Sequence, residues 1–176
     1  MDQVDPDLQL VADFVNTVDL ENDEETLVDS RALGDWLRTR GLWHGRTTRA
    51  DLDEALHVRE ALRELLRANN ECEAEATGAA QRLTAAAARL RVDVCFVDSG
   101  GVRITARSGG VAPVLAAAGQ AMVDGTWQRL KACRSDTCRW AFVDLARNRS
   151  RHWCSMETCG NREKARAFRK RRRGVS

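Results

Sequence analysis

The sequence lacks the features that would place it in a membrane or in a secretory route. It has no run of 18 apolar residues, which excludes a transmembrane helix by length. Its start, MDQVDPDLQL, is acidic and has no basic segment followed by an apolar core, so we do not expect a secretory signal. We therefore expect a cytoplasmic protein whose six cysteines are thiols or metal ligands rather than disulfides.

Familiar catalytic motifs are missing as well. The chain contains no G-x-S-x-G, no phosphate-binding P-loop and no H-E-x-x-H, and its three histidines are scattered. The Gly-Gly pairs at 100–101 and 109–110 fit turns better than phosphate loops. We therefore expect no enzymatic activity.

Charge of each sign is concentrated in a different part of the chain. Residues 126–176 contain 15 Lys and Arg and 4 Asp and Glu. Residues 1–125 contain 13 Lys and Arg and 22 Asp and Glu. A basic C-terminal module on an acidic body predicts a polyanionic partner. The alternative is a basic tail that only improves solubility.

Hydrophobic periodicity predicts a mainly helical body over residues 1–125. The expected helices lie near residues 10–18, from Ser30 as the cap to near Gly41, after Thr48, over the alanine-rich stretch 73–90 and over 114–123. Alternating apolar residues in 92–97 and 101–107, around a Gly-containing turn, predict one β-hairpin. The expected fold is mainly α within the α+β class, with a helical domain (1–125) followed by a small module (126–176).

Four cysteines in the last third of the chain carry the clearest chemical signal. Cys133, Cys138, Cys154 and Cys159 have the spacing C-x4-C-x15-C-x4-C. Two such loops can present four thiolates to one tetrahedral Zn²⁺, and a site filled by four protein ligands is structural rather than catalytic. An iron–sulfur cluster also accepts four cysteines. His152 lies beside the second pair, but four cysteines already fill the site.

Residues 133–173 closely resemble the CGNR zinc finger. The sequence C-G-N-R, which gives the family its name, lies at 159–162, and W-C-S-M lies at 153–156. The element with aromatic residues and Asp that precedes them is formed by Trp140, Phe142 and Asp144. Upstream, the segment DFVNTVD at 13–19 resembles the opening signature of the ABATE domain. That family is described as stress-related transcriptional regulators, so the resemblance implies one structural zinc and DNA binding by the finger.

The residues after the last cysteine predict a basic helix. Gly160 allows a tight turn out of the metal loop, and Asn161 can cap the helix. Asn161, Ala165 and Phe168 share a face suited to packing on the zinc core, while several arginines share another. The residues expected to contact DNA, mostly through phosphates, are Arg149, Arg151, Arg162, Lys164, Arg166, Arg169, Lys170 and Arg173. Trp140 and Trp153 are expected to pack around zinc rather than to stack on RNA bases.

Polar residues also occur inside the apolar helices of the body. We predict that Asn16 and Arg59 line one pocket for a small-molecule effector; the alternative is that such groups hydrogen-bond within the protein and fix helix packing. The sequence thus predicts a DNA-binding transcriptional regulator whose body binds a ligand, forms a homodimer, or both. The alternatives are a protein–protein adaptor in the transcription machinery and an RNA-binding zinc module.

Overall fold

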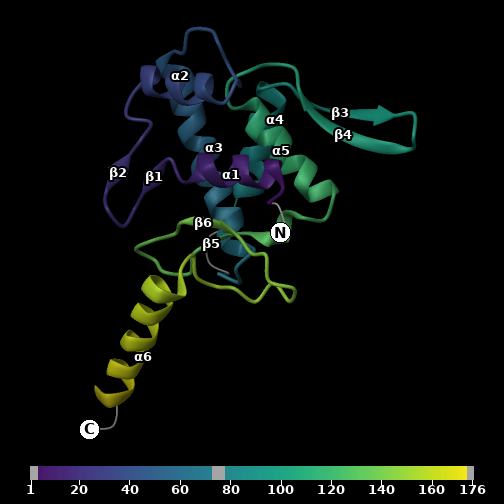
Figure 1. Cartoon of the computed structure of the whole chain (residues 1–176). Coiled ribbons are helices and arrows are strands. Elements are labelled where there is room, and N and C mark those ends of the chain that lie inside the picture. The colour runs from purple at the N-terminus through teal and green to yellow at the C-terminus, as the bar shows by residue number, and fades with distance from the viewer. Residues whose placement is uncertain (1–3, 73–77, 174–176) are drawn as a thin grey trace.

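The computed structural model describes residues 4–72 and 78–173, without the side chain of Arg173. Helices α1 to α5 form the body, and α6 extends away from it toward the C-terminus (Figure 1). The helices are α1 (Pro6–Val15), α2 (Ser30–Thr39), α3 (Arg49–Ala68), α4 (Ala79–Arg89), α5 (Ala112–Val123) and α6 (Asn161–Arg173), with a 3₁₀ turn η1 (Trp127–Arg129) and a π-helical turn η2 (Met156–Gly160). The predicted mainly helical fold is confirmed.

Within the described residues, three antiparallel two-stranded sheets join these helices. They are β1 (Val18–Asp19) with β2 (Glu24–Glu25), β3 (Val92–Val97) with β4 (Gly101–Ala106), and β5 (Leu130–Ala132) with β6 (Ala141–Val143). The predicted hairpin is therefore β3–β4, and it projects sideways from the body in Figure 1. The other two sheets are only two or three residues per strand, which is too short for an alternating pattern to reveal them.

The helix boundaries follow from capping. Thr48 and Asp51 form a reciprocal capping box at the start of α3, as the predicted start at Thr48 requires. The cap of α2 is Asp29, not Ser30, because the Asp29 carboxylate accepts the Ala32 N–H at 2.8 Å. Of the predicted alanine-rich helix, the part from Ala79 is α4, and residues 73–77 lie outside the described residues.

One hydrophobic core joins the body to the C-terminal module. Phe14, Leu62 and other buried residues of the helices form the centre, and Leu130 and Ala141 of β5 and β6 belong to the same cluster. Helix α1 packs against β6, and α3 packs against β5. The predicted domain boundary falls at Gly125, which lies in a turn and has a φ of +71°. The apolar core nevertheless continues from the helices before this residue into β5 and β6 after it.

Candidate metal centre and basic helix

The structure brings Cys133, Cys138, Cys154 and Cys159 together. Their four sulfur atoms all lie within 4.8 Å of one another, and the Sγ–Sγ distances are 3.6 Å for Cys138–Cys154 and 3.7 Å for Cys154–Cys159. A tetrahedral zinc with Zn–S bonds of about 2.3 Å separates its sulfurs by about 3.8 Å. All four are free thiols at these distances, so the cluster has the size of a zinc site rather than of disulfides.

Two short loops of different construction carry the cysteine pairs. Cys133 follows β5 and donates its N–H to the Trp140 carbonyl at 2.9 Å, while Cys138 lies in a turn in which its N–H donates to Ser135 O at 3.0 Å. Cys159 lies within η2, whose cap is Ser155, because the Ser155 hydroxyl accepts the Thr158 N–H at 3.3 Å. The sequence prediction of Asn161 as the cap is wrong, because helical structure already begins one turn earlier.

Gly160 leaves space for neighbouring side chains and has no left-handed backbone conformation. A Cβ at this position would lie 2.8 Å from Met156 Sδ and 3.3 Å from Trp153 Cδ1. The glycine of the CGNR motif therefore allows Trp153 to lie close to the metal loop. The sequence had instead predicted a tight turn at Gly160.

Aromatic side chains cover the cysteine cluster. Phe142 is buried in it, and Trp140 and Trp153 pack against it from outside, as predicted. The Arg151 guanidinium lies 4.8 Å from the Phe142 ring centroid and donates to the carbonyl oxygens of Trp153, at 2.8 Å, and of Cys154. Arg151 thus holds the second metal loop, a role that sequence reasoning missed.

The pKa values of the four thiols depend on hydrogen bonds between them and on burial. Hydrogen bonds from the Cys138 and Cys154 thiols lower the pKa of Cys133, and burial raises the pKa of Cys159. Without a cation, four sulfurs clustered this closely cannot all be thiolates. Zinc supplies that charge when bound, and the four cysteines are the residues that hold it.

A buried ion pair orders the basic loop between the cysteine pairs. Lys131 and Asp144 are both buried, and Lys131 Nζ lies 2.9 Å from Asp144 Oδ2. Lys131 also donates to the backbone carbonyls of Arg149 and Arg151, and the Arg151 N–H donates to Asp144 at 2.9 Å. Burial opposes ionisation of Asp144, but the hydrogen bonds from Lys131 and the backbone hold its pKa below the ordinary value.

The end of α3 attaches this module to the body. Asn70 Nδ2 donates to the carbonyls of Ala132 at 2.7 Å and His152 at 2.9 Å, and Asn70 Oδ1 lies 3.0 Å from His152 Nδ1. Asn69 donates to the carbonyls of Trp127 and Leu130. His152 is therefore bound by the helix and is not a metal ligand. The sequence signal, two adjacent asparagines at a helix end, was not recognised.

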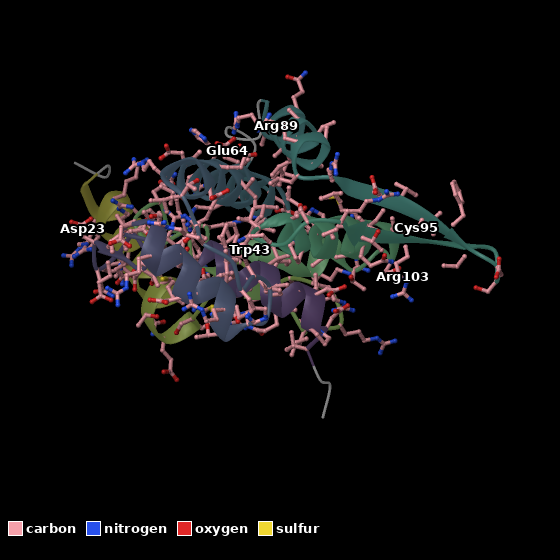
Figure 2. The ribbon with its side chains drawn as sticks, turned by 90° about the horizontal axis from the view of Figure 1, so that it is seen from above. Asp23, Trp43, Glu64, Arg89, Cys95 and Arg103 are labelled. Carbon is pink, nitrogen blue, oxygen red and sulfur yellow. The ribbon has the colours of Figure 1, made fainter. Side chains whose placement is uncertain are left out.

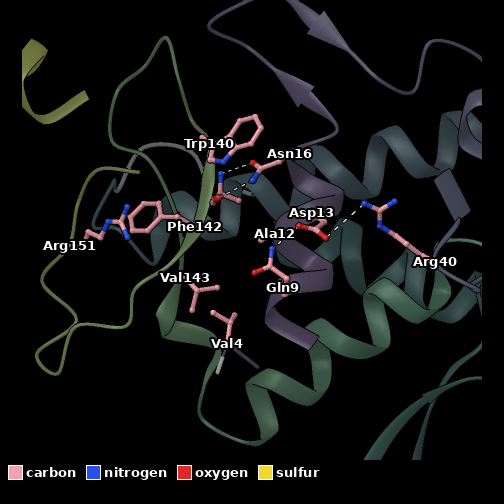
Figure 3. Close-up of a pocket in the computed structure, with 11 residues that line it drawn as sticks. Val4, Gln9, Ala12, Asp13, Asn16, Arg40, Trp140, Phe142, Val143 and Arg151 are labelled. Carbon is pink, nitrogen blue, oxygen red and sulfur yellow. Dashed lines mark hydrogen bonds and ion pairs between the residues drawn. The ribbon is translucent and has the colours of Figure 1, made fainter. Parts of the chain in front are cut away.

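Asn16 and Arg59 bind different partners within the protein. Asn16 makes a two-way hydrogen bond with the Ala141 backbone, at 2.9 and 2.7 Å, and borders a cavity of about 500 Å³ between α1 and β6 (Figure 3). Arg59 is not among the residues that line this cavity; it binds the Glu25 carboxylate with two hydrogen bonds at 2.8 and 2.7 Å. Both contacts correspond to the alternative in which polar groups fix packing. A small-molecule effector stays a prediction.

The basic residues predicted to contact DNA lie on α6 and on the 144–151 loop. Helix α6 is exposed along nearly its whole length, including Ala165 and Phe168, so the predicted packing of that face on the zinc core is wrong. The reason is that α6 points away from the body after Gly160 (Figure 1). Arg162 is tied to the body by an ion pair with Glu21 at 2.5 Å. The side chain of Arg173 lies outside the described residues.

Comparison with known families agrees with this geometry. The ABATE profile, described as "Putative stress-induced transcription regulator", matches residues 8–132. The chain belongs to the ABATE family. The CGNR zinc finger profile follows at residues 129–172, so the four-cysteine cluster is a site for one structural zinc rather than an iron–sulfur cluster. No curated protein matches the chain. No described helix is long and apolar enough to cross a membrane.

Proposed function

We propose that this ABATE protein regulates transcription by binding duplex DNA through α6, which the zinc site holds at its base. The observation that carries the proposal is the position of α6, which stands clear of the body (Figure 1). Most of its residues are Arg or Lys. Among the described residues, the side chains of Lys164, Arg169 and Lys170 form no hydrogen bond or ion pair with the protein.

The chemistry of α6 suits a nucleic-acid duplex. Its 13 residues span about 20 Å, and a single helix fits the major groove of B-DNA. Guanidinium groups donate in pairs to phosphate oxygens, and most protein–DNA hydrogen bonds go to the backbone. We therefore assign phosphate contacts to most of α6 and to Arg149, while Arg151 and Arg162 position the loop and the helix base.

The test removes charge from the helix without removing the helix. The variant Lys164→Ala/Arg169→Ala/Lys170→Ala is compared with Arg31→Ala/Arg46→Ala/Arg49→Ala, which removes the same charge from exposed positions on the body. Fluorescence anisotropy on random duplex DNA measures affinity against salt concentration. We expect the α6 variant to bind more weakly and its salt slope to fall by up to about three, roughly one for each phosphate that the protein stops neutralising. The body variant should resemble the wild type.

Three results would contradict the proposal. Equal weakening in both variants would mean that only net charge matters, and tighter binding to RNA than to duplex DNA would favour the RNA-binding alternative. Absence of any nucleic-acid binding would favour an adaptor that binds an acidic protein surface. A cytoplasmic location belongs to the same proposal, because four zinc-binding thiolates require a reducing compartment.

A further inference from the structure

The β3–β4 hairpin has one apolar face that the body covers only in part. The side chains on that face are Val92, Val94, Phe96, Val102, Ile104 and Ala106, since cross-strand partners share a face. At the root, Ile104 packs on Gly119 of α5, where a Cβ would come within 3.2 Å of Ile104 Cγ2. Further out, Val94 is 58% exposed and Phe96 is 86% exposed. Figure 2 shows the hairpin extending beyond the helices, with Cys95 and Arg103 labelled on it.

The two edges of this hairpin differ. The Ile104 N–H of β4 donates to Gln120 Oε1 of α5 at 2.8 Å, so it points outward and α5 occupies that edge. Ile104 is paired with Val94. In an antiparallel ladder both members of such a pair point outward, so the backbone groups of Val94 and, two residues on, of Phe96 face away from β4. No described residue binds them.

The open edge also lacks the usual protection against strand pairing. Exposed edges in native proteins carry lysine, proline or a bulge. Here the sequence from Val94 to Val97 is V-C-F-V, with charges only at the flanking Asp93 and Asp98. A two-stranded hairpin with an uncovered apolar face is marginal by itself, so the edge is suited to receive another strand.

We propose that β3 pairs antiparallel with β3 of a second copy of this chain, which makes one four-stranded sheet across a two-fold axis. The outward groups of Val94 and Phe96 define the register: Val94 lies opposite Phe96 of the second copy, and Cys95 lies opposite itself. Because the axis passes through Cys95, every contact occurs twice. An aromatic residue opposite a β-branched residue is a favourable cross-strand pair.

The charges along this register favour a second copy as the occupant. Asp93 lies opposite Val97 of the second copy, and Asp98 lies opposite Val92, so no like charges face each other. In this register Asp98 of one copy lies next to Arg91 of the other, because Arg91 directly precedes Val92. The two-fold axis repeats this pair of opposite charges at the other end of the pairing. Asp93 is already paired with Arg107 of its own chain.

The test is the molar mass of the zinc-loaded full chain by size-exclusion chromatography with light scattering. The wild type is expected at twice the 19.6 kDa chain mass, and Phe96→Lys, which puts a charge on the open edge, is expected as a monomer. Phe96 is almost fully exposed, so this variant keeps its fold, which circular dichroism and zinc content verify. Arg103→Glu is the matched control, since it changes charge on β4 and on the opposite face, and it should stay dimeric.

Cross-linking tests the register separately. Non-hydrogen-bonded pairs hold their Cα atoms about 4.5 Å apart, so a short bismaleimide should join the two Cys95 thiols. The covalent dimer should form in wild type and in Cys72→Ser but not in Cys95→Ser. A monomeric wild type, or a Phe96→Lys variant that remains fully dimeric, would overturn the proposal. A dimer without a Cys95 cross-link would overturn this register.

Discussion

Buried arginines show how single residues connect distant segments of this protein. Arg59 and Arg63 are both buried on α3, and Glu60 accepts a hydrogen bond from each of them, at 2.9 and 3.0 Å. Arg59 also donates a hydrogen bond to the Glu25 carboxylate of β2, and Arg63 donates one to the Val15 carbonyl at 2.7 Å. A buried guanidinium is costly unless it is fully hydrogen-bonded. These partners therefore fix where α1 and the β1–β2 hairpin lie against α3.

The first residue-scale prediction concerns Glu25. Burial opposes its ionisation, but the hydrogen bonds from Arg59 and from the Leu27 N–H keep its pKa below the ordinary value of 4.5. A lowered folded pKa contributes stability above the unfolded pKa and loses it as pH falls through the folded pKa. We expect Glu25→Gln to cost about 1–3 kcal/mol at neutral pH, and this cost should shrink at pH values below about 4.5.

Urea denaturation of wild type and variant, in pH steps down to the lowest pH at which zinc stays bound, measures this difference. Glu24→Gln serves as the control, because Glu24 is exposed and is not bound by Arg59. A stability difference for Glu25→Gln that stays constant with pH would show that the Arg59 pair does not control this carboxylate.

Among the elements, α3 has the largest influence on the metal module. Its 20 residues begin in a capping box and end at two asparagines whose side chains bind four backbone carbonyls of the 127–152 segment. Those carbonyls belong to β5, to the turn before it and to the residue next to Trp153. The two residues that follow α3 therefore help to fix the position of the metal loops on the body.

Replacing Asn70 tests this element. Asn70→Ala leaves the Ala132 carbonyl without its Asn70 donor and removes one of the two donors to the His152 carbonyl; an unsatisfied buried group costs about 1–3 kcal/mol. For a chain of this size each kcal/mol lowers the melting temperature by about 2–4 °C. Thermal unfolding followed by circular dichroism measures the decrease. Asn22→Ala, which removes an exposed hydrogen bond to Asp19, should change it little; equal effects of the two changes would contradict the assigned role.

At the scale of the whole molecule, the zinc site adjoins the main core. Ala132 and Cys133 are neighbours in sequence, but the first belongs to the body's core and the second to the metal cluster. Because a structural zinc site contributes its binding energy to folding, loss of the metal should disturb the body too, and not only the module.

We therefore expect one zinc per chain and a single cooperative thermal transition that moves to lower temperature when zinc is chelated. Cys159→Ser should reproduce the shift in the presence of zinc, whereas Cys72→Ser, outside the cluster, should not. Metal analysis and differential scanning calorimetry supply the measurements. Two separate transitions, with the upper one unchanged by chelation, would show that the body folds independently of the metal.

The local and chemical features of this protein follow from its amino-acid chain alone. Periodicity predicted α2, α3, α5 and the β3–β4 hairpin, and the Thr48 cap predicted the start of α3, because these signals lie within one element. The cysteine spacing and the CGNR motif predicted the zinc site, since ligand type and loop length are written directly in the chain. Charge segregation separated the acidic body from the basic module in the same way.

Which groups meet across long sequence distances depends instead on the three-dimensional packing. Asn16 binds Ala141, 125 residues away, and Arg59 binds Glu25, and no pattern in the sequence indicated either partner. Phe168 was expected on the metal core, but α6 leaves the body and exposes it. A polar residue in an apolar helix indicates that a partner is needed, because burial without one is costly; which segment supplies that partner depends on how the helices pack.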